Sequence, residues 1–199
     1  LELMVTRIAQ IDSHYALTIL INSMGVPKIL HMLRTSRCFD SLRLVEFDGI
    51  LKSGLETILN VELSGSQWEQ ACLPIREGGL GIRTAVSLAP SAFLASAVSS
   101  CELQQDILPM ISSLTDFDLS DNLNYWSNMN SAQPLVGDDA RKQRSWDNVY
   151  IQLTKTRLLT NCTTDIDRAR LLAAYDAHSG DWLHALPLPN CGLFLDNEV

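Results

Sequence analysis

The stretch Cys72-Leu-Pro-Ile-Arg-Glu-Gly-Gly-Leu-Gly-Ile-Arg83 says more about the fold of this chain than any other part of its sequence. Its three glycines, Gly78, Gly79 and Gly81, permit turns with positive φ, which other residues adopt only at a steric cost. Apolar residues alternate on both sides of these glycines: Leu73, Ile75, Leu80 and Ile82. Pro74 cannot donate a hydrogen bond to a sheet and would confine its arm to an edge. The stretch therefore predicts a small β-hairpin.

Outside this stretch, apolar residues recur at helical spacing. Asp40 or Ser41 is expected to cap the helix that runs to about Leu59, and Pro90 to break or restart another helix near its middle. Residues 115–140 have the Asp, Asn, Ser and Gln content of a loop. We expect helices over residues 1–11, 14–24, 28–34, 42–59, 64–71, 84–99, 102–114 and 141–161, and another from 165. The sequence predicts a mainly α fold with one small β-hairpin.

Length and composition indicate a globular chain. Its 199 residues suit one large domain or two small ones, and 46% hydrophobic with 19% charged residues is not the composition of a disordered chain. The net charge is −8, but residues 85–140 carry seven acidic residues and no Lys or Arg. The segments before and after them are nearly balanced, with 8 basic against 9 acidic residues over 1–84 and 7 against 7 over 141–199. The two ends are therefore free to contact phosphate.

The cysteines and apolar runs bear on the compartment. Five scattered cysteines without a C-x-x-C pair argue against a disulfide framework and a zinc site, and favour free thiols in a reducing, intracellular environment, nuclear or cytoplasmic. No run approaches the roughly 20 apolar residues of a membrane-spanning helix, so we expect no membrane partner. The chain begins inside a helical pattern and ends without a helix cap, so we expect it to be a fragment of a longer protein.

Two short sequences contain residue types found in catalytic sites. Asp138 and Asp139 follow Gly137, and adjacent aspartates hold the metal ions of many polymerases. Here they lie in a loop that enters a helix, where capping explains them. His178-Ser-Gly-Asp181 contains residues of a hydrolytic triad, but such close neighbours rarely meet in that geometry. A hydrolase built on either sequence is the interpretation to exclude.

Basic residues concentrate in one predicted helix–loop–helix, where only three acidic residues accompany them: Lys28, Arg34, Arg37, Arg43 and Lys52. One interpretation is an ordinary solvated face. The other is a surface that follows a phosphate backbone and needs charge but no base readout. Arg141, Lys142 and Arg144 form a second, smaller cluster with the same two interpretations.

Several motifs resemble the region after the catalytic palm in reverse transcriptases of non-LTR (LINE-like) retrotransposons. The resemblance is firmest before residue 100, and the Pro-Ile-Arg-x-Gly-Gly-Leu-Gly-Ile string is its most specific part. The motifs are Val26-Pro-Lys-Ile-Leu-His-Met-Leu-Arg34, Leu44-x-x-Phe-Asp-x-x-Leu51, Trp68-x-x-Ala-Cys-Leu-Pro-Ile-Arg-x-Gly-Gly-Leu-Gly-Ile-Arg83, Leu88-Ala-Pro-Ser-Ala-Phe-Leu-Ala-Ser96 and His178-Ser-Gly-Asp-Trp-Leu-x-Ala-Leu-Pro187.

The resemblance implies four consecutive parts: a thumb-like helical bundle over 1–65, the glycine hairpin and apolar helices over 66–114, a polar linker over 115–140 and a helical connector over 141–199. The thumb of such enzymes grips the primer–template duplex, and here its five basic residues would face an RNA–DNA duplex. The family's Tyr-x-Asp-Asp carboxylates are absent from this sequence. The chain alone should therefore hold no cofactor and polymerise nothing, because the parent's Mg²⁺ belongs to the palm, which would be a partner of this region.

The sequence thus predicts the non-catalytic thumb and connector of an RNA-directed DNA polymerase. The alternative is a degenerate remnant, or a helical protein-interaction module that binds no nucleic acid. Exposed apolar helix faces would serve the module, and its acidic middle segment could not hold phosphate.

Overall fold

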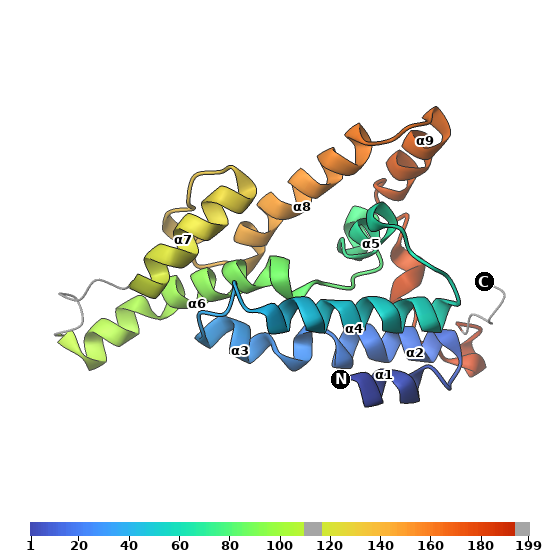
Figure 1. The fold of residues 1–199 in the computed structure, drawn as a ribbon, viewed down its shortest axis with the longest axis horizontal. Coiled ribbons are helices and arrows are strands. Elements are labelled where there is room, and N and C mark those ends of the chain that lie inside the picture. The colour runs from blue at the N-terminus through green and yellow to red at the C-terminus, as the bar shows by residue number, and fades with distance from the viewer. Residues whose placement is uncertain (110–116, 194–199) are drawn as a thin grey trace. The chain divides into compact units, whose positions relative to one another are not determined.

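The computed structural model describes residues 1–109 and 117–193, and the chain is mainly helical (Figure 1). No β-strand occurs in these ranges. Short 3₁₀ turns connect several of the helices. The α-helices are α1 (Glu2–Ile8), α2 (Ser13–Ile19), α3 (Leu30–Thr35), α4 (Leu42–Leu59), α5 (Gly65–Ala71), α6 (Ala85–Ile107), α7 (Phe117–Asn130), α8 (Gln143–Thr160) and α9 (Asp165–Ala174). The predicted helical fold class is confirmed.

The predicted β-hairpin at residues 73–83 is wrong. Ile75–Glu77 form one 3₁₀ turn, and Gly78 ends it with a left-handed φ of 82°. The N–H groups of Leu80 and Gly81 donate to the carbonyls of Ala71 and Leu73 (3.0 and 2.9 Å), at the end of α5. The alternating apolar residues therefore fold back onto the preceding helix. They do not pair as two strands, because the backbone N–H groups of this stretch already donate to carbonyls nearby in the sequence.

Most helix positions agree with the sequence prediction, and two expectations are wrong. α7 occupies Phe117–Asn130, within the segment expected to be a loop. α6 continues through Pro90, whose side chain is fully buried, without the expected break. The weak helix expected at 102–114 is the end of α6 as far as Ile107, and residues 110–116 lie outside the described ranges.

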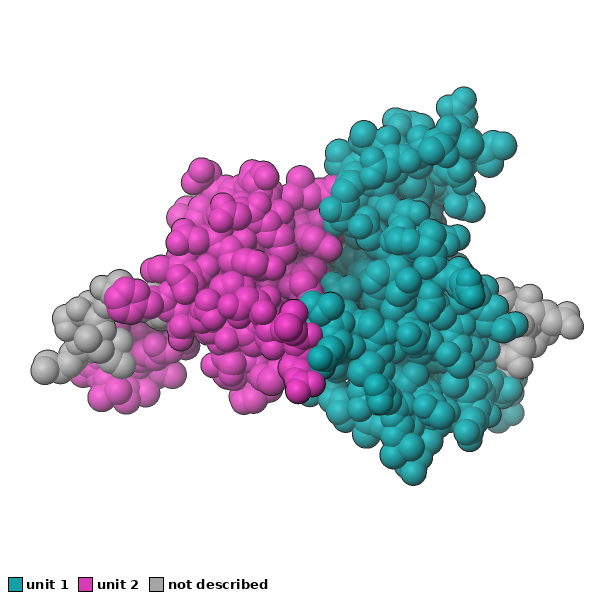
Figure 2. All heavy atoms as spheres, in the orientation of Figure 1, with its two compact units in different colours: residues 1–28, 45–84, 154–199 teal, residues 29–44, 85–153 magenta. Residues whose placement is uncertain are grey.

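The described chain divides into two compact units, coloured separately in Figure 2. Unit 1 consists of Leu1–Lys28, Val45–Thr84 and Thr154–Val199, of which residues 194–199 are not described. Unit 2 consists of Ile29–Leu44 and Ala85–Leu153, without residues 110–116. Each unit joins segments that are distant in the sequence. The four predicted parts, in contrast, follow one another along the chain, with boundaries after residues 65, 114 and 140. Those four parts stay a prediction.

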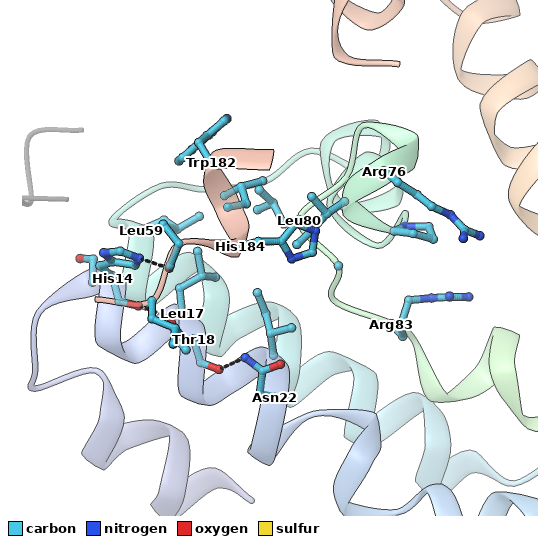
Figure 3. A pocket seen from close by; sticks show the side chains of 18 residues that line it. His14, Leu17, Thr18, Asn22, Leu59, Arg76, Leu80, Arg83, Trp182 and His184 are labelled. Atoms are coloured by element: carbon cyan, nitrogen blue, oxygen red, sulfur yellow. Dashed lines mark hydrogen bonds between the residues drawn. The ribbon is translucent and has the colours of Figure 1, made fainter. Parts of the chain in front are cut away.

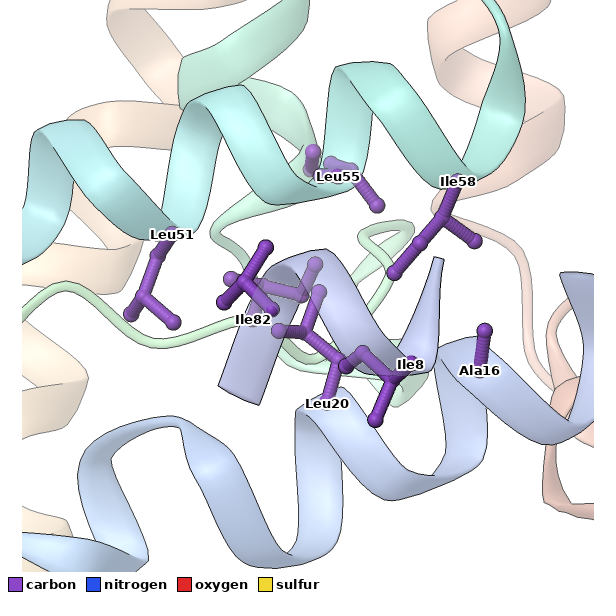
Figure 4. Packing of buried hydrophobic residues seen from close by; sticks show 9 residues of the cluster. Ile8, Ala16, Leu20, Leu51, Leu55, Ile58 and Ile82 are labelled. Carbon is purple, nitrogen blue, oxygen red and sulfur yellow. The ribbon is translucent and has the colours of Figure 1, made fainter. Parts of the chain in front are cut away.

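Unit 1 is built around a core between its N-terminal helices and α4. Figure 4 shows Leu51, Leu55 and Ile58 of α4 directed toward the side chains of the N-terminal helices. The 72–83 stretch adds Ile82 to the same cluster. The complete cluster is Val5, Ile8, Ala16, Leu20, Leu51, Leu55, Ile58, Ala71 and Ile82. The glycine-rich turn is thus part of this core.

Unit 2 has a separate core around two tryptophans. Trp126 of α7 and Trp146 of α8 are fully buried and meet edge to face, with ring centroids 4.8 Å apart. Trp146 Nε1 donates to the Ala140 carbonyl (2.7 Å), which fixes the start of α8. Leu94 and Ala95 of α6 complete the cluster with Ala140. Trp126, one of the two tryptophans, therefore comes from the 115–140 segment that was expected to be a loop.

Two helical stretches of the described residues, Ser13–Thr35 and Ala85–Ile107, are long and apolar enough to cross a membrane by length and composition alone. Buried residues make up 28% and 44% of their most apolar windows. The buried face of α6 packs within unit 2, as in a core helix. This is weak support for a membrane span.

Candidate functional site

The two lysines predicted to bind nucleic acid both belong to unit 1. Lys28 is exposed, and its Nζ lies 3.3 Å from Met4 Sδ. Lys52 is half-buried on α4 and pairs with Glu56 one turn later (3.6 Å). An i,i+4 pair of this kind contributes little to stability, so phosphate could displace the carboxylate from Lys52.

Arg37, in unit 2, is surrounded by acidic residues. Its guanidinium pairs with Asp40 at 3.2 Å and with two aspartates of α7, Asp118 at 3.8 Å and Asp121 at 3.4 Å. It also lies over the Phe39 ring, with Cζ 4.6 Å from the centroid. A duplex would have to compete with three carboxylates for this side chain. Arg37 is the least available of the predicted five.

The other two arginines, Arg34 and Arg43, are exposed in the same unit. Arg34 donates from Nε and Nη2 to Gln143 Oε1 (3.1 and 2.9 Å), across 109 residues of sequence. This contact brings the first basic cluster to the segment that carries the second, Arg141, Lys142 and Arg144. The sequence predicted both basic clusters, but it did not predict the contact between their segments.

Acidic residues also accompany the second cluster. Arg141 pairs with Glu102 of α6, and the hydrogen bond from Arg141 lowers the pKa of that carboxyl. Lys142 pairs with Asp139 at 3.5 Å. Arg144 is exposed and has no acidic partner among the described residues. The unit 2 surface therefore carries both signs of charge, with Arg34 and Arg144 its more available cations.

Neither catalytic candidate has catalytic geometry. Asp138 and Asp139 lie in one exposed 3₁₀ turn, and Asp139 also accepts from Ser145 Oγ (3.3 Å). His178 Nδ1 and Asp181 Oδ2 form an exposed pair at 2.7 Å, but Ser179 Oγ donates to the Ala174 carbonyl and not to the imidazole. Within residues 1–109 and 117–193, no group of three His, Cys, Asp or Glu side chains could hold a metal ion.

Unit 1 contains a cavity of about 730 Å³, which the sequence did not predict. Three segments and the end of α4 surround it: α2 with the π-helical turn Leu20–Met24, the 74–83 stretch, and the segment around the 3₁₀ turn Asp181–His184 (Figure 3). Its apolar wall includes Leu17, Leu59 and Leu80. Its volume lies in the range typical of small-molecule sites. The sequence signal was present only as isolated apolar and cationic residues in segments far apart.

The basic groups of the cavity are two arginines and two histidines. Figure 3 shows Arg76 and Arg83 on the side away from His14, with His184 between them and His14 in this view. His14 Nε2 donates to the Ala185 carbonyl (3.1 Å), which holds the C-terminal segment against α2. None of the described residues that line the cavity is Asp or Glu. The cavity is therefore apolar with a basic side.

Burial raises the pKa of two groups near the 72–83 stretch. Burial, and to a smaller extent the charge of Asp48, raises the pKa of the Cys72 thiol well above its ordinary value. Arg83 acts on this pKa in the opposite direction. Burial, with a smaller effect of Cys162, raises the pKa of Tyr175 to about 12. All five cysteines are free thiols. Cys72 stays protonated near neutral pH and is a poor nucleophile there.

Comparisons with protein-family models, with curated proteins and with solved structures found no match for this chain. The resemblance to non-LTR reverse transcriptases therefore rests on the sequence motifs alone.

Proposed function

We propose that this chain is the non-catalytic thumb and connector of a non-LTR reverse transcriptase, which holds primer–template nucleic acid and links the palm to later modules. The motifs given above support the family. The mainly helical architecture is compatible with a thumb. Catalysis and its Mg²⁺ would belong to the palm of the parent enzyme.

The observation that carries the proposal is the contact between Arg34 and Gln143. It joins two basic segments, so that Arg34 and Arg144 lie on the same unit near the start of α8. Neighbouring cations of this kind suit a phosphate backbone, which needs charge at intervals and no base-specific partner. The aspartates around Arg37 weaken the attraction, so we expect modest, sequence-independent affinity.

Fluorescence anisotropy with a labelled RNA–DNA hybrid tests the proposal over a series of salt concentrations. Binding should weaken steeply as salt rises, because each neutralised phosphate releases counterions. Arg34→Ala with Arg144→Ala should lower affinity and reduce the slope of log affinity against log salt by about 1 for each cation removed.

Arg170→Ala is the matched control. Arg170 is an exposed arginine of unit 1 that pairs with Asp167, and neither basic cluster contains it. This variant should bind as the unmodified chain does. Binding that ignores salt, and that also survives alanine at Lys28, Arg34, Arg37, Arg43 and Lys52, would reject the proposal.

Exposed apolar residues favour a second candidate, a helical protein-interaction module. Near the end of α6, Leu103, Ile107 and Leu108 are 62%, 67% and 55% exposed, and Phe117 at the start of α7 is 76% exposed. Exposed apolar groups in such number are typical of interaction surfaces. Self-association in sedimentation, abolished by Leu103→Glu with Ile107→Glu and accompanied by no hybrid binding, would favour this candidate.

A further inference from the structure

Specific contacts between segments of unit 1 hold the walls of its cavity in place. The turn Asp181–His184 packs against the Ile75–Glu77 turn, and Gly180 approaches Ile75 so closely that a Cβ there would lie 2.9 Å from the Ile75 carbonyl oxygen. His14 fixes the other end of this segment through the Ala185 carbonyl. The segment therefore forms a wall anchored at two points, with the cavity beside it.

The cavity interior is apolar. Leu17 and Ile21 line it from the N-terminal helices, Leu59 from the end of α4, and Leu80 from the glycine-rich stretch. Each of these four side chains also packs against the unit 1 core, so the lining is continuous with that core. Such a lining suits an apolar chain or ring, which loses contact with water on entering.

Arg76 keeps its charge available at the cavity. Its only acidic neighbour among the described residues is Glu77, with Arg76 Nε 3.5 Å from Glu77 Oε1. Glu77 makes a shorter pair with Lys155, at 2.7 Å and largely buried, and Lys155 Nζ also lies over the Tyr175 ring. Because Lys155 already compensates the Glu77 carboxylate, Arg76 retains guanidinium donors for an anion.

We propose that this cavity binds a small amphipathic organic anion, with an apolar chain or ring against Leu17, Ile21, Leu59 and Leu80 and a carboxylate, sulfonate or phosphate head near Arg76 and His184. Arg76 and His184 both line the cavity, and none of its described lining residues is Asp or Glu. A neutral molecule of the same shape would gain only the apolar contacts. The proposal is independent of nucleic-acid binding.

The first measurement uses 1-anilinonaphthalene-8-sulfonate, whose fluorescence rises on entering an apolar site. We expect saturable binding at one equivalent per chain. Dodecanoate should displace the dye more effectively than 1-dodecanol, which has the same chain without the charge, by about tenfold, the typical effect of one charge-assisted hydrogen bond.

Two variants locate the site. Arg76→Gln with His184→Gln removes the two basic groups assigned to the anionic head, while Arg83 remains, and should weaken dodecanoate about tenfold while leaving 1-dodecanol unchanged. Asn22→Trp places an indole at the cavity from an exposed position and should exclude dye, dodecanoate and dodecanol alike. Arg157→Gln, an exposed arginine of unit 1 that does not line the cavity, is the control and should bind all three normally.

Circular dichroism confirms that each variant is folded. Equal affinity for dodecanoate and dodecanol in the unmodified chain would overturn the preference for an anion. Dye binding that persists unchanged in folded Asn22→Trp would overturn the assignment to this cavity, as would the absence of saturable binding.

Discussion

At the scale of single residues, the glycines of the 72–83 stretch serve two different purposes. Gly78 and Gly81 have φ of 82° and 79°, the left-handed region that favours glycine. Gly79 has no positive φ, but a Cβ there would lie 2.1 Å from the Leu73 carbonyl oxygen and 2.6 Å from that of Gln70. Gly79 is required because backbone packs directly against it.

Gly79→Ala should lower the free energy of unfolding by about 3 kcal/mol, because backbone must move to admit the methyl group. Urea unfolding followed by circular dichroism measures the change. Gly49→Ala is the matched control, since nothing lies within 4 Å of a Cβ at this position inside α4. Alanine there should stabilise by about 0.5–1 kcal/mol through helix propensity. Equal effects of the two substitutions would contradict the packing argument.

Tyr175 gives a prediction for alkaline pH. Its phenolic oxygen is buried without a hydrogen-bond partner among the described residues, and its pKa rises to about 12. Above pH 10, an unfolded chain ionises this phenol while the folded chain keeps it neutral. Its contribution to stability is therefore complete below about pH 10 and is lost as pH rises through about 12.

Ultraviolet difference spectra recorded after a rapid pH jump measure this ionisation in the folded chain. We expect a step near pH 12 that Tyr175→Phe removes. Tyr125→Phe, which alters a ring packed on Phe39, should retain the step. A titration curve that is the same in the unmodified chain and in Tyr175→Phe would contradict the assignment.

At the scale of elements, two helices, α5 and α9, begin where a side chain of their own sequence satisfies the backbone. Ser64 Oγ accepts from Gln67 N (3.3 Å), and Gln67 Oε1 accepts from Ser64 N (2.9 Å), which makes a complete capping box for α5. Thr164 Oγ1 accepts from Asp167 N (3.1 Å) in the same way at the start of α9. α5 leads directly into the glycine-rich turn, so its start affects the position of that turn.

Ser64→Ala should lower the free energy of unfolding by about 1 kcal/mol, the usual cost of losing an N-cap. Differential scanning calorimetry and chemical unfolding both measure it. Ser53→Ala is the control, because Ser53 is an exposed residue within α4 where alanine is the better helix former. Loss of stability in Ser53→Ala equal to that in Ser64→Ala would show that the cap is not the cause.

At the scale of the whole molecule, the described residues include two core clusters built from different helices. One gathers Leu51, Leu55 and Ile58 with the N-terminal helices, and the other gathers Trp126 and Trp146 with α6. Each core unites residues distant in the sequence. Cutting the chain at a sequence boundary such as residue 65 would remove Ala71 and Ile82 from the first core.

Leu55→Ala tests whether the two cores respond separately. Leu55 is fully buried in the first core, and its truncation should cost about 2–5 kcal/mol. Hydrogen exchange should accelerate in α1, α2 and α5 more than in α7. Trp146→Ala is the reciprocal variant and should accelerate exchange in α7 more than in α1. The same acceleration in both units from either variant would mean that they unfold as one.

The sequence alone determined the helical class and most helix positions, because apolar periodicity and caps act over a few residues. Where a local rule was applied too strictly, the prediction was wrong. Alternating apolar residues at 73–82 suggested strands, but the N–H groups of Leu80 and Gly81 found carbonyls at the end of α5. The polar residues of 115–140 suggested a loop, but Trp126 is buried, and Leu119, Leu123 and Met129 of the same helix pack against its core.

Only the tertiary structure decided which charges are available and where a cavity lies. Arg34 meets Gln143 and Arg37 meets the aspartates of α7, and nothing local to either arginine encodes those partners. The cavity likewise needs α2, the glycine-rich stretch and the turn at 181–184 to meet. The charges of these side chains could be read from the sequence. Their availability depends on distances between segments, and packing over the whole unit sets those distances.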